Sequence, residues 1–189
     1  MEKFKQLMSK LQPYKSPDEY VTDKYSPEDM VNEVSEASSQ LSPDDVARIY
    51  NAESTMGKNL KNSSSSAAGN FHIIDSTRDR TLNELKKQGI DEIPTNPLRK
   101  DALLMKTLLN KNENSLLNSQ SGPKEPDLKN LYLMHKYGTT GALRALNNPN
   151  DEESRAKLKS VMANLNKPMP KKDIEQVGAK DLLDLLKEN

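Results

Sequence analysis

Cysteine is absent from this 189-residue sequence, and histidine occurs only twice, as His72 and His135. The lack of cysteine excludes disulfides, thiolate metal ligands, iron–sulfur clusters and cysteine nucleophiles. Two histidines are too few for a histidine-rich metal site, so we expect no metal and no cofactor. Acid–base chemistry in this chain would therefore depend on carboxylates.

The sequence also lacks an excess of charge of either sign, because 28 basic residues balance 28 acidic ones. Without net positive charge the chain has no general attraction to nucleic acid, so we expect no specific nucleic-acid partner. No apolar run approaches the roughly 18 residues of a membrane-spanning helix. Residues 1–11 alternate charged and apolar residues instead of forming the apolar core of a secretion signal. We expect a soluble chain without a transmembrane segment.

Hydrophobic residues make up only 33% of the chain, which is low for a protein that buries a large core. Residues 1–40 are especially polar and are interrupted by prolines, so we predict a polar N-terminal arm there and a compact domain over 41–189. Within the arm, the run Ser-Pro-Glu-Asp at 26–29 predicts the start of a short helix reaching Val34, which would pack on the domain or on a partner.

The same start signal recurs at residues 42–45. Val46, Ile49 and Tyr50 then follow at the spacing of one helix face, and Glu53 continues that face. The sequence therefore predicts a helix with a glutamate on its apolar stripe.

The remaining segments predict a mainly α fold. Residues 61–70 are small and polar, which is typical of a loop, and 71–74 is the one candidate strand. Amphipathic patterns predict further helices from about 75–77 to Gly89, from Pro97 through Leu109, from Leu128 to a stop at Gly138, through Ala142 to Leu146, over 151–165 and over 182–186.

Glu53 is the most informative single residue. A glutamate on the inward face of a helix must be neutralised or paired. A carboxylic acid held protonated near neutral pH is what glycosidic cleavage needs to protonate the leaving oxygen. The alternative is that Glu53, near the end of its helix, points into solvent, as surface glutamates commonly do.

Three segments carry a family resemblance. They are Ala52-Glu53-Ser54, then the run SAAGNFH at 66–72 followed by Thr77, and then DLKNLYLMHKYGTTG at 127–141. In this order they resemble the lytic transglycosylase (goose-type lysozyme-like) family, which shows Glu-Ser, then Gly-Ala-x-Gly-x-x-Gln, then a Thr. The third segment resembles the Leu-Tyr-Leu-Ala-His-x-x-Gly-x-x-Gly block of virion-associated transglycosylases of tailed phages.

The resemblance covers roughly residues 42–189 and includes two departures. His72 stands where the family has glutamine, and Ser66-Ala67 replaces the Gly-Ala that starts the motif. The implied fold is a lysozyme-like helical domain. The implied reaction is cleavage of the MurNAc–GlcNAc bond by Glu53, which protonates the glycosidic oxygen and then accepts the proton of the sugar's own C6 hydroxyl, so that an anhydro ring closes without water. This lyase reaction needs no second carboxylate.

The resemblance also implies substrate-binding residues around Glu53, namely Ser54, Gly69, Phe71, His72, Tyr132 and His135. A structural alternative stays open for each of them. Ser54 would be a helix-end hydroxyl, Gly69 a turn residue, His72 a loop contact, and the three rings of Phe71, Tyr132 and His135 parts of the core.

The resemblance implies a peptidoglycan-degrading enzyme carried in a bacteriophage virion, as a tail or internal ejection protein. It would open the cell wall at the host periplasm during DNA ejection. Its partners would be peptidoglycan glycan strands and other virion or tail proteins, with homo-oligomers in the particle. One alternative is a structural virion or tail component that has this fold and little or no activity, and a weaker one is a free endolysin that needs a holin.

Overall fold

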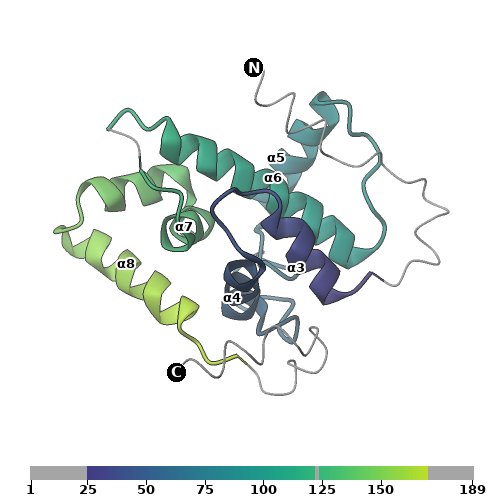
Figure 1. Cartoon of the computed structure of the whole chain (residues 1–189), viewed down its shortest axis with the longest axis horizontal. Coiled ribbons are helices and arrows are strands. Elements are labelled where there is room, and N and C mark those ends of the chain that lie inside the picture. Colours follow the sequence, from purple (N-terminus) through teal and green to yellow (C-terminus); the bar gives the residue numbers. More distant parts are fainter. Residues whose placement is uncertain (1–24, 122–123, 170–189) are drawn as a thin grey trace.

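The computed structural model describes residues 25–121 and 124–169, which form six α-helices and no strands (Figure 1). The helices are α3 (Pro27–Ser35), α4 (Pro43–Ser54), α5 (Asp75–Lys87), α6 (Pro97–Leu117), α7 (Leu128–Asn147) and α8 (Glu152–Leu165). The prediction of a mainly α fold is therefore confirmed for these residues. The predicted helix over 182–186 lies outside them.

The candidate strand at 71–74 was a wrong prediction. This segment makes only an isolated bridge between Ile73 and Ala68, and Ala68 makes a second bridge with Lys61. The short apolar run is buried by its loop because Phe71 and Ile73 enter the core, without any neighbouring strand to pair with. None of the helices in the described residues is long and apolar enough to span a membrane.

Helices α3 and α4 begin as the sequence predicts. Ser26 and Ser42 each accept a hydrogen bond from the backbone N–H three residues later, at Asp29 and Asp45, and each aspartate accepts one from the serine backbone N–H in return. Such capping boxes satisfy N–H groups that a helix start leaves without partners. Both starts are therefore encoded within four consecutive residues.

The helices pack around one hydrophobic core. α4 contacts α3 and α8, α6 contacts α3, α5 and α7, and α7 packs along α8. Figure 1 shows α4 nearly end-on, with α8 on one side and α3 and α6 on the other. Buried side chains from five of these helices form the core, among them Val34, Ile49, Met105, Tyr132 and Val161.

The predicted arm is described only from residue 25 onward. In that part, α3 inserts Met30 and Val34, which are both 0% exposed, against α4 and α6. Residues 25–40 thus share the core of the helical domain instead of standing apart from it, because a short amphipathic helix finds its apolar partners on helices distant in sequence. Residues 1–24 of the predicted arm lie outside the described residues.

Helix α7 is bent at Gly138, which has φ 69° and ψ 166°. A glycine adopts such a conformation at little cost, and this one ends the first half of the helix where the sequence predicts a stop. The first half directs Tyr132 toward Glu53 on α4 and His135 toward the backbone of Phe71, and the second half buries Ala142 and Ala145.

The chain that follows α8 returns to α4. The side-chain amide of Asn51 donates hydrogen bonds to the carbonyl oxygens of Lys167 and Pro168, both at 3.2 Å. The ammonium of Lys167 donates to the carbonyl oxygen of Ala52, also at 3.2 Å. These contacts fix the last turn of α4, where Glu53 lies.

Candidate active site

Residues 55–74, here called the cleft loop, leave α4 through a tight turn. Thr55, Met56 and Gly57 all have positive φ, at 54°, 55° and 81°. The Ser54 hydroxyl stabilises this turn, since it donates to the carbonyl oxygen of Tyr50 at 3.2 Å and accepts from the N–H of Gly57 at 3.0 Å. Ser54 is 0% exposed, so its side chain serves the helix end and does not reach the surface.

Glu53 lies largely withdrawn from water, with 12% of its side chain exposed. The hydroxyl of Tyr132, on α7, donates a hydrogen bond of 2.6 Å to Oε1 of Glu53. Burial raises the pKa of Tyr132 far above its usual range, and the charge of Glu53 adds to that rise. Tyr132 therefore remains protonated and acts as a permanent donor to Glu53. It is 0% exposed and lines no open surface.

His72 faces Glu53 from the cleft loop. Its Nδ1 lies 3.6 Å from Oε2 of Glu53, and its Nε2 lies 2.6 Å from the backbone carbonyl oxygen of Asn59. His72 has φ 46°, a left-handed conformation that residues with side chains rarely adopt. The cleft loop thus holds the ring against Glu53 through contacts on both nitrogens.

The middle of the cleft loop is anchored by Asp101 on α6. One carboxylate oxygen, Oδ2, accepts hydrogen bonds from the backbone N–H and from the side-chain amide of Asn70, each at 2.7 Å. Gly69 makes this approach possible, because a Cβ at Gly69 would lie 2.8 Å from both carboxylate oxygens, and its φ of 82° also favours glycine. Gly69 therefore shapes the loop and offers no side chain to a ligand.

Phe71 and His135 connect the cleft loop to α7. The Phe71 side chain is 0% exposed and packs against Tyr50, with ring centroids 5.9 Å apart, so the ring is part of the core. Its backbone carbonyl oxygen lies 2.8 Å from Nε2 of His135. His135 is half-buried and stacks on Tyr132, with ring centroids 6.2 Å apart.

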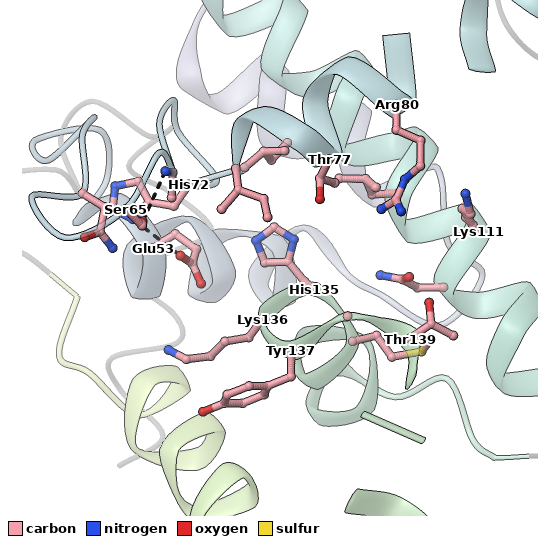
Figure 2. A pocket seen from close by; sticks show the side chains of 18 residues that line it. Glu53, Ser65, His72, Thr77, Arg80, Lys111, His135, Lys136, Tyr137 and Thr139 are labelled. Carbon is pink, nitrogen blue, oxygen red and sulfur yellow. Dashed lines mark hydrogen bonds and ion pairs between the residues drawn. The ribbon is translucent and has the colours of Figure 1, made fainter. Parts of the chain in front are cut away.

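A cleft of about 640 Å³ opens beside Glu53. Figure 2 shows His135 in its middle, with Glu53 and His72 toward one end and Arg80 and Lys111 toward the other. Glu53 is the one carboxylate among the described residues that line it. The lining consists of Glu53, Asn62, Ser65, Ala67, His72, Ile73, Ile74, Thr77, Arg80, Leu108, Lys111, Asn112, Met134, His135, Lys136, Tyr137, Gly138 and Thr139.

The structure brings Glu53, His72, Tyr132 and His135 close to one another. Of these, Glu53, His72 and His135 line the cleft. Among the described residues, no group of three or more histidines and acidic residues is arranged to hold a metal ion.

Sequence reasoning missed the wall of the cleft formed by α5 and α6. Arg80 follows Thr77 by one turn on α5, and Lys111 and Asn112 follow Leu108 on α6. Asn112 is only 6% exposed although it is polar. A buried asparagine on the stripe of Met105 and Leu109 was the available signal, since such a group needs a partner or a ligand.

Comparison with known proteins found no match: no family model, no curated protein and no solved structure matches this chain.

Proposed function

We propose that this chain is a peptidoglycan lytic transglycosylase with a lysozyme-like helical domain and with Glu53 as its catalytic acid. The observation that carries this proposal is that Glu53 is the one carboxylate among the described lining residues of the cleft. Most glycosidases that use water need two carboxylates, one as acid and one as base or nucleophile. A reaction in which one group first gives and then takes a proton needs only one.

The proposed reaction uses the two oxygens of Glu53 differently. Oε1 is occupied by the Tyr132 hydroxyl, so the reacting oxygen is Oε2. The proton on Oε2 passes to the glycosidic oxygen as the bond from C1 of MurNAc to that oxygen breaks. The C6 hydroxyl oxygen of the same MurNAc then bonds to C1, and its proton passes to Oε2. The products are an anhydro-MurNAc end and a GlcNAc hydroxyl, and Glu53 is regenerated.

The cleft suits a polar polymer. Its lining offers hydroxyls and amides at Ser65, Thr77, Asn112 and Thr139. The half-buried ring of His135 lies between Ser65 and Thr139 (Figure 2). Such groups match the hydroxyls and N-acetyl groups of a glycan strand. A volume of about 640 Å³ lies within the range of sites that enclose a ligand of several rings.

The proposed setting is a tailed-phage virion, where the chain would act on the host wall at the periplasm during DNA ejection, in contact with other virion or tail proteins. The support is the likeness of residues 127–141 to the block of virion-associated transglycosylases. The proposed homo-oligomer in the particle has the same support.

A structural virion component of little or no activity is the second candidate. Two observations favour it: His72 stands in place of the family glutamine, and Phe71 and Tyr132 are 0% exposed and therefore out of reach of a sugar. It predicts a folded protein that leaves murein intact.

Mass spectrometry of the products from purified murein tests the proposal. Wild-type protein is expected to release anhydro ends, and Glu53→Gln is expected to lower the rate by a factor of roughly 100 to 10,000 because the acid is removed. Glu92→Gln, which makes the same change at an exposed residue outside the cleft, is the matched control and is expected to retain the wild-type rate.

Each other outcome has a definite meaning. Reducing ends in place of anhydro ends would replace the lyase reaction by hydrolysis. No cleavage by wild-type protein with an intact helical circular dichroism spectrum would favour the structural candidate.

A further inference from the structure

One end of the cleft is lined by positively charged side chains. Figure 2 shows Arg80 and Lys111 at the end opposite to Glu53, where they extend from α5 and α6. Arg80 is exposed, and no carboxylate among the described residues forms an ion pair with it. A guanidinium without a carboxylate partner can bind an anionic ligand through two parallel hydrogen bonds.

The neighbouring charges leave Arg80 as the main attraction for an anion. Lys111 is paired with Glu84 of α5, since its Nζ lies 2.7 Å from Oε1 of that carboxylate. Glu53, the one carboxylate among the described lining residues, lies toward the other end of the cleft. The end formed by α5 and α6 therefore has a net positive charge.

Beside these charges lies a buried amide without a hydrogen-bond partner. Asn112 of α6 lines the cleft and is only 6% exposed. Its side chain makes no hydrogen bond to any part of the chain that the structure describes. A side-chain amide can donate two hydrogen bonds and accept two, and its burial without partners costs free energy. Such a group in the wall of a cleft indicates a ligand that carries both donors and acceptors.

We propose that the end of the cleft formed by Arg80, Lys111 and Asn112 binds the stem peptide of murein, with a peptide carboxylate on Arg80 and a peptide amide group on Asn112. This assignment rests on the proposed function, because it names a further part of the same substrate. The stem is attached through the lactyl group on C3 of MurNAc, the sugar whose C1 reacts beside Glu53. A MurNAc ring held at Glu53 thus places a chain of amides and carboxylates next to the same cleft.

The chemistry of the stem matches this end of the cleft better than the chemistry of the sugars does. Stem peptides carry free carboxylates and secondary amides, whereas the strand is uncharged where each lactyl group is joined to a stem. Glycan hydroxyls could satisfy Asn112 but would leave Arg80 without an anion. A guanidinium next to an unpartnered amide therefore favours the stem over the strand.

Isothermal titration calorimetry of the full chain with a soluble N-acetylmuramyl peptide tests the assignment. The probe carries L-Ala, D-Glu, a diamino acid and D-Ala with free carboxylates, and it has no glycosidic bond to cleave. Arg80→Gln is expected to weaken its binding by a factor of roughly 10 to 100, as for the loss of a charge-assisted hydrogen bond. Arg155→Gln, the same change at an exposed residue outside the cleft, is the matched control and is expected to keep the wild-type affinity.

Two further probes identify the carboxylate that Arg80 binds. N-acetylmuramic acid has only the lactyl carboxylate, and the muramyl peptide with its carboxylates converted to amides has none. Both are expected to bind wild-type protein more weakly than the intact probe does. Equal affinity of wild-type protein for the intact probe and for either of these two would overturn the proposal, and so would equal affinity of wild type and Arg80→Gln for the intact probe.

Asn112→Leu separates a binding role from a structural one. An amide without a partner contributes no hydrogen bond to the fold, so an apolar side chain of similar size should leave the midpoint of urea denaturation unchanged or raise it. The same variant is expected to bind the muramyl peptide more weakly by a factor of roughly 2 to 10. A lowered midpoint, or an unchanged affinity, would contradict the role of Asn112 as a ligand contact.

Murein cleavage extends the test to the reaction. Wild-type protein is expected to have a higher kcat/KM on strands that carry stems than on strands from which an amidase has removed them. Arg80→Gln should lower the ratio of these two values roughly tenfold, mainly through KM for the strands with stems. An equal ratio in both proteins would overturn the proposal. If wild-type protein cleaves no murein, the proposed function fails, while the calorimetry still decides whether this end of the cleft binds the stem.

Discussion

The six helices, here called the helical frame, and the cleft loop gain their conformations from different kinds of contact. Helices α3 and α4 begin at capping boxes in which all partners lie within four consecutive residues. The cleft loop, by contrast, is held by groups far away in sequence. Asp101 binds Asn70 across 31 positions, and Nε2 of His135 meets the carbonyl oxygen of Phe71 across 64.

The geometry of the candidate site therefore depends on contacts of a different kind from those that order the helices. The frame gains its order from local signals and from a shared core, so single contacts matter little to it. The cleft loop contains no helix and only isolated bridges, so a few side chains carry its conformation. Substitutions in the two regions should therefore differ in how much they lower the free energy of unfolding and in how far along the chain their effects extend.

The largest effect is expected where the loop enters the core. Phe71→Ala removes a ring that is 0% exposed and should lower the free energy of unfolding by about 3–5 kcal/mol, through lost burial and the cavity that remains. Urea denaturation followed by circular dichroism measures this. Phe71→Leu, which keeps most of the volume, should cost less than about 1.5 kcal/mol. A cost of less than about 1.5 kcal/mol for Phe71→Ala as well would mean that the loop contributes little to the core.

An intermediate effect is expected at the anchor of the loop. Asp101→Ala leaves the N–H and the amide of Asn70, a residue 5% exposed, without their acceptor, which should cost about 2–3 kcal/mol. Asp101→Asn, whose amide oxygen can still accept, should cost less. Hydrogen exchange should locate the change, with faster exchange at residues 69–73 and unchanged protection in α8. Faster exchange throughout the helices would contradict the separation of loop and frame.

The smallest effect is expected at the helix starts. Ser42→Ala removes the side-chain acceptor of the α4 cap and should lower the free energy of unfolding by about 1 kcal/mol. Ser26→Ala, at the equivalent position of α3, should cost a similar amount. Murein cleavage by folded Ser42→Ala should stay at the wild-type rate. A loss of activity at this cap would show that the frame and the site are coupled more tightly than their contacts indicate.

The predictable part of the fold is the part that depends on short-range sequence signals. The Ser-Pro-acid runs predicted the starts of α3 and α4, and hydrophobic periodicity predicted α5 to α8. Gly138 predicted a helix stop, and the structure has a bend there between the two halves of α7. Each of these features depends on residues within a few positions of one another, so one sequence suffices to find them.

The site was predictable only in outline. Helical phase allowed Glu53 to face inward or to point into solvent, and its partner on Oε1 is 79 positions away, a distance that no local pattern encodes. The same limit applies to the anchor at Asp101 and to the packing of α3 on α6. The burial of Ser54 and Phe71 also depends on tertiary packing, which is why substrate contact was expected at residues that instead support the loop.

The return of the chain to α4 has a consequence for the order of assembly during synthesis. The last turn of α4 needs the carbonyl groups of residues 167 and 168, which are 116 and 117 positions beyond Asn51. A ribosome that has made α4 must therefore make α5 to α8 before the carboxyl group of Glu53 gains its final surroundings. Closure of so long a loop is slow compared with helix formation. The nascent chain thus carries a formed helix long before it carries a formed site.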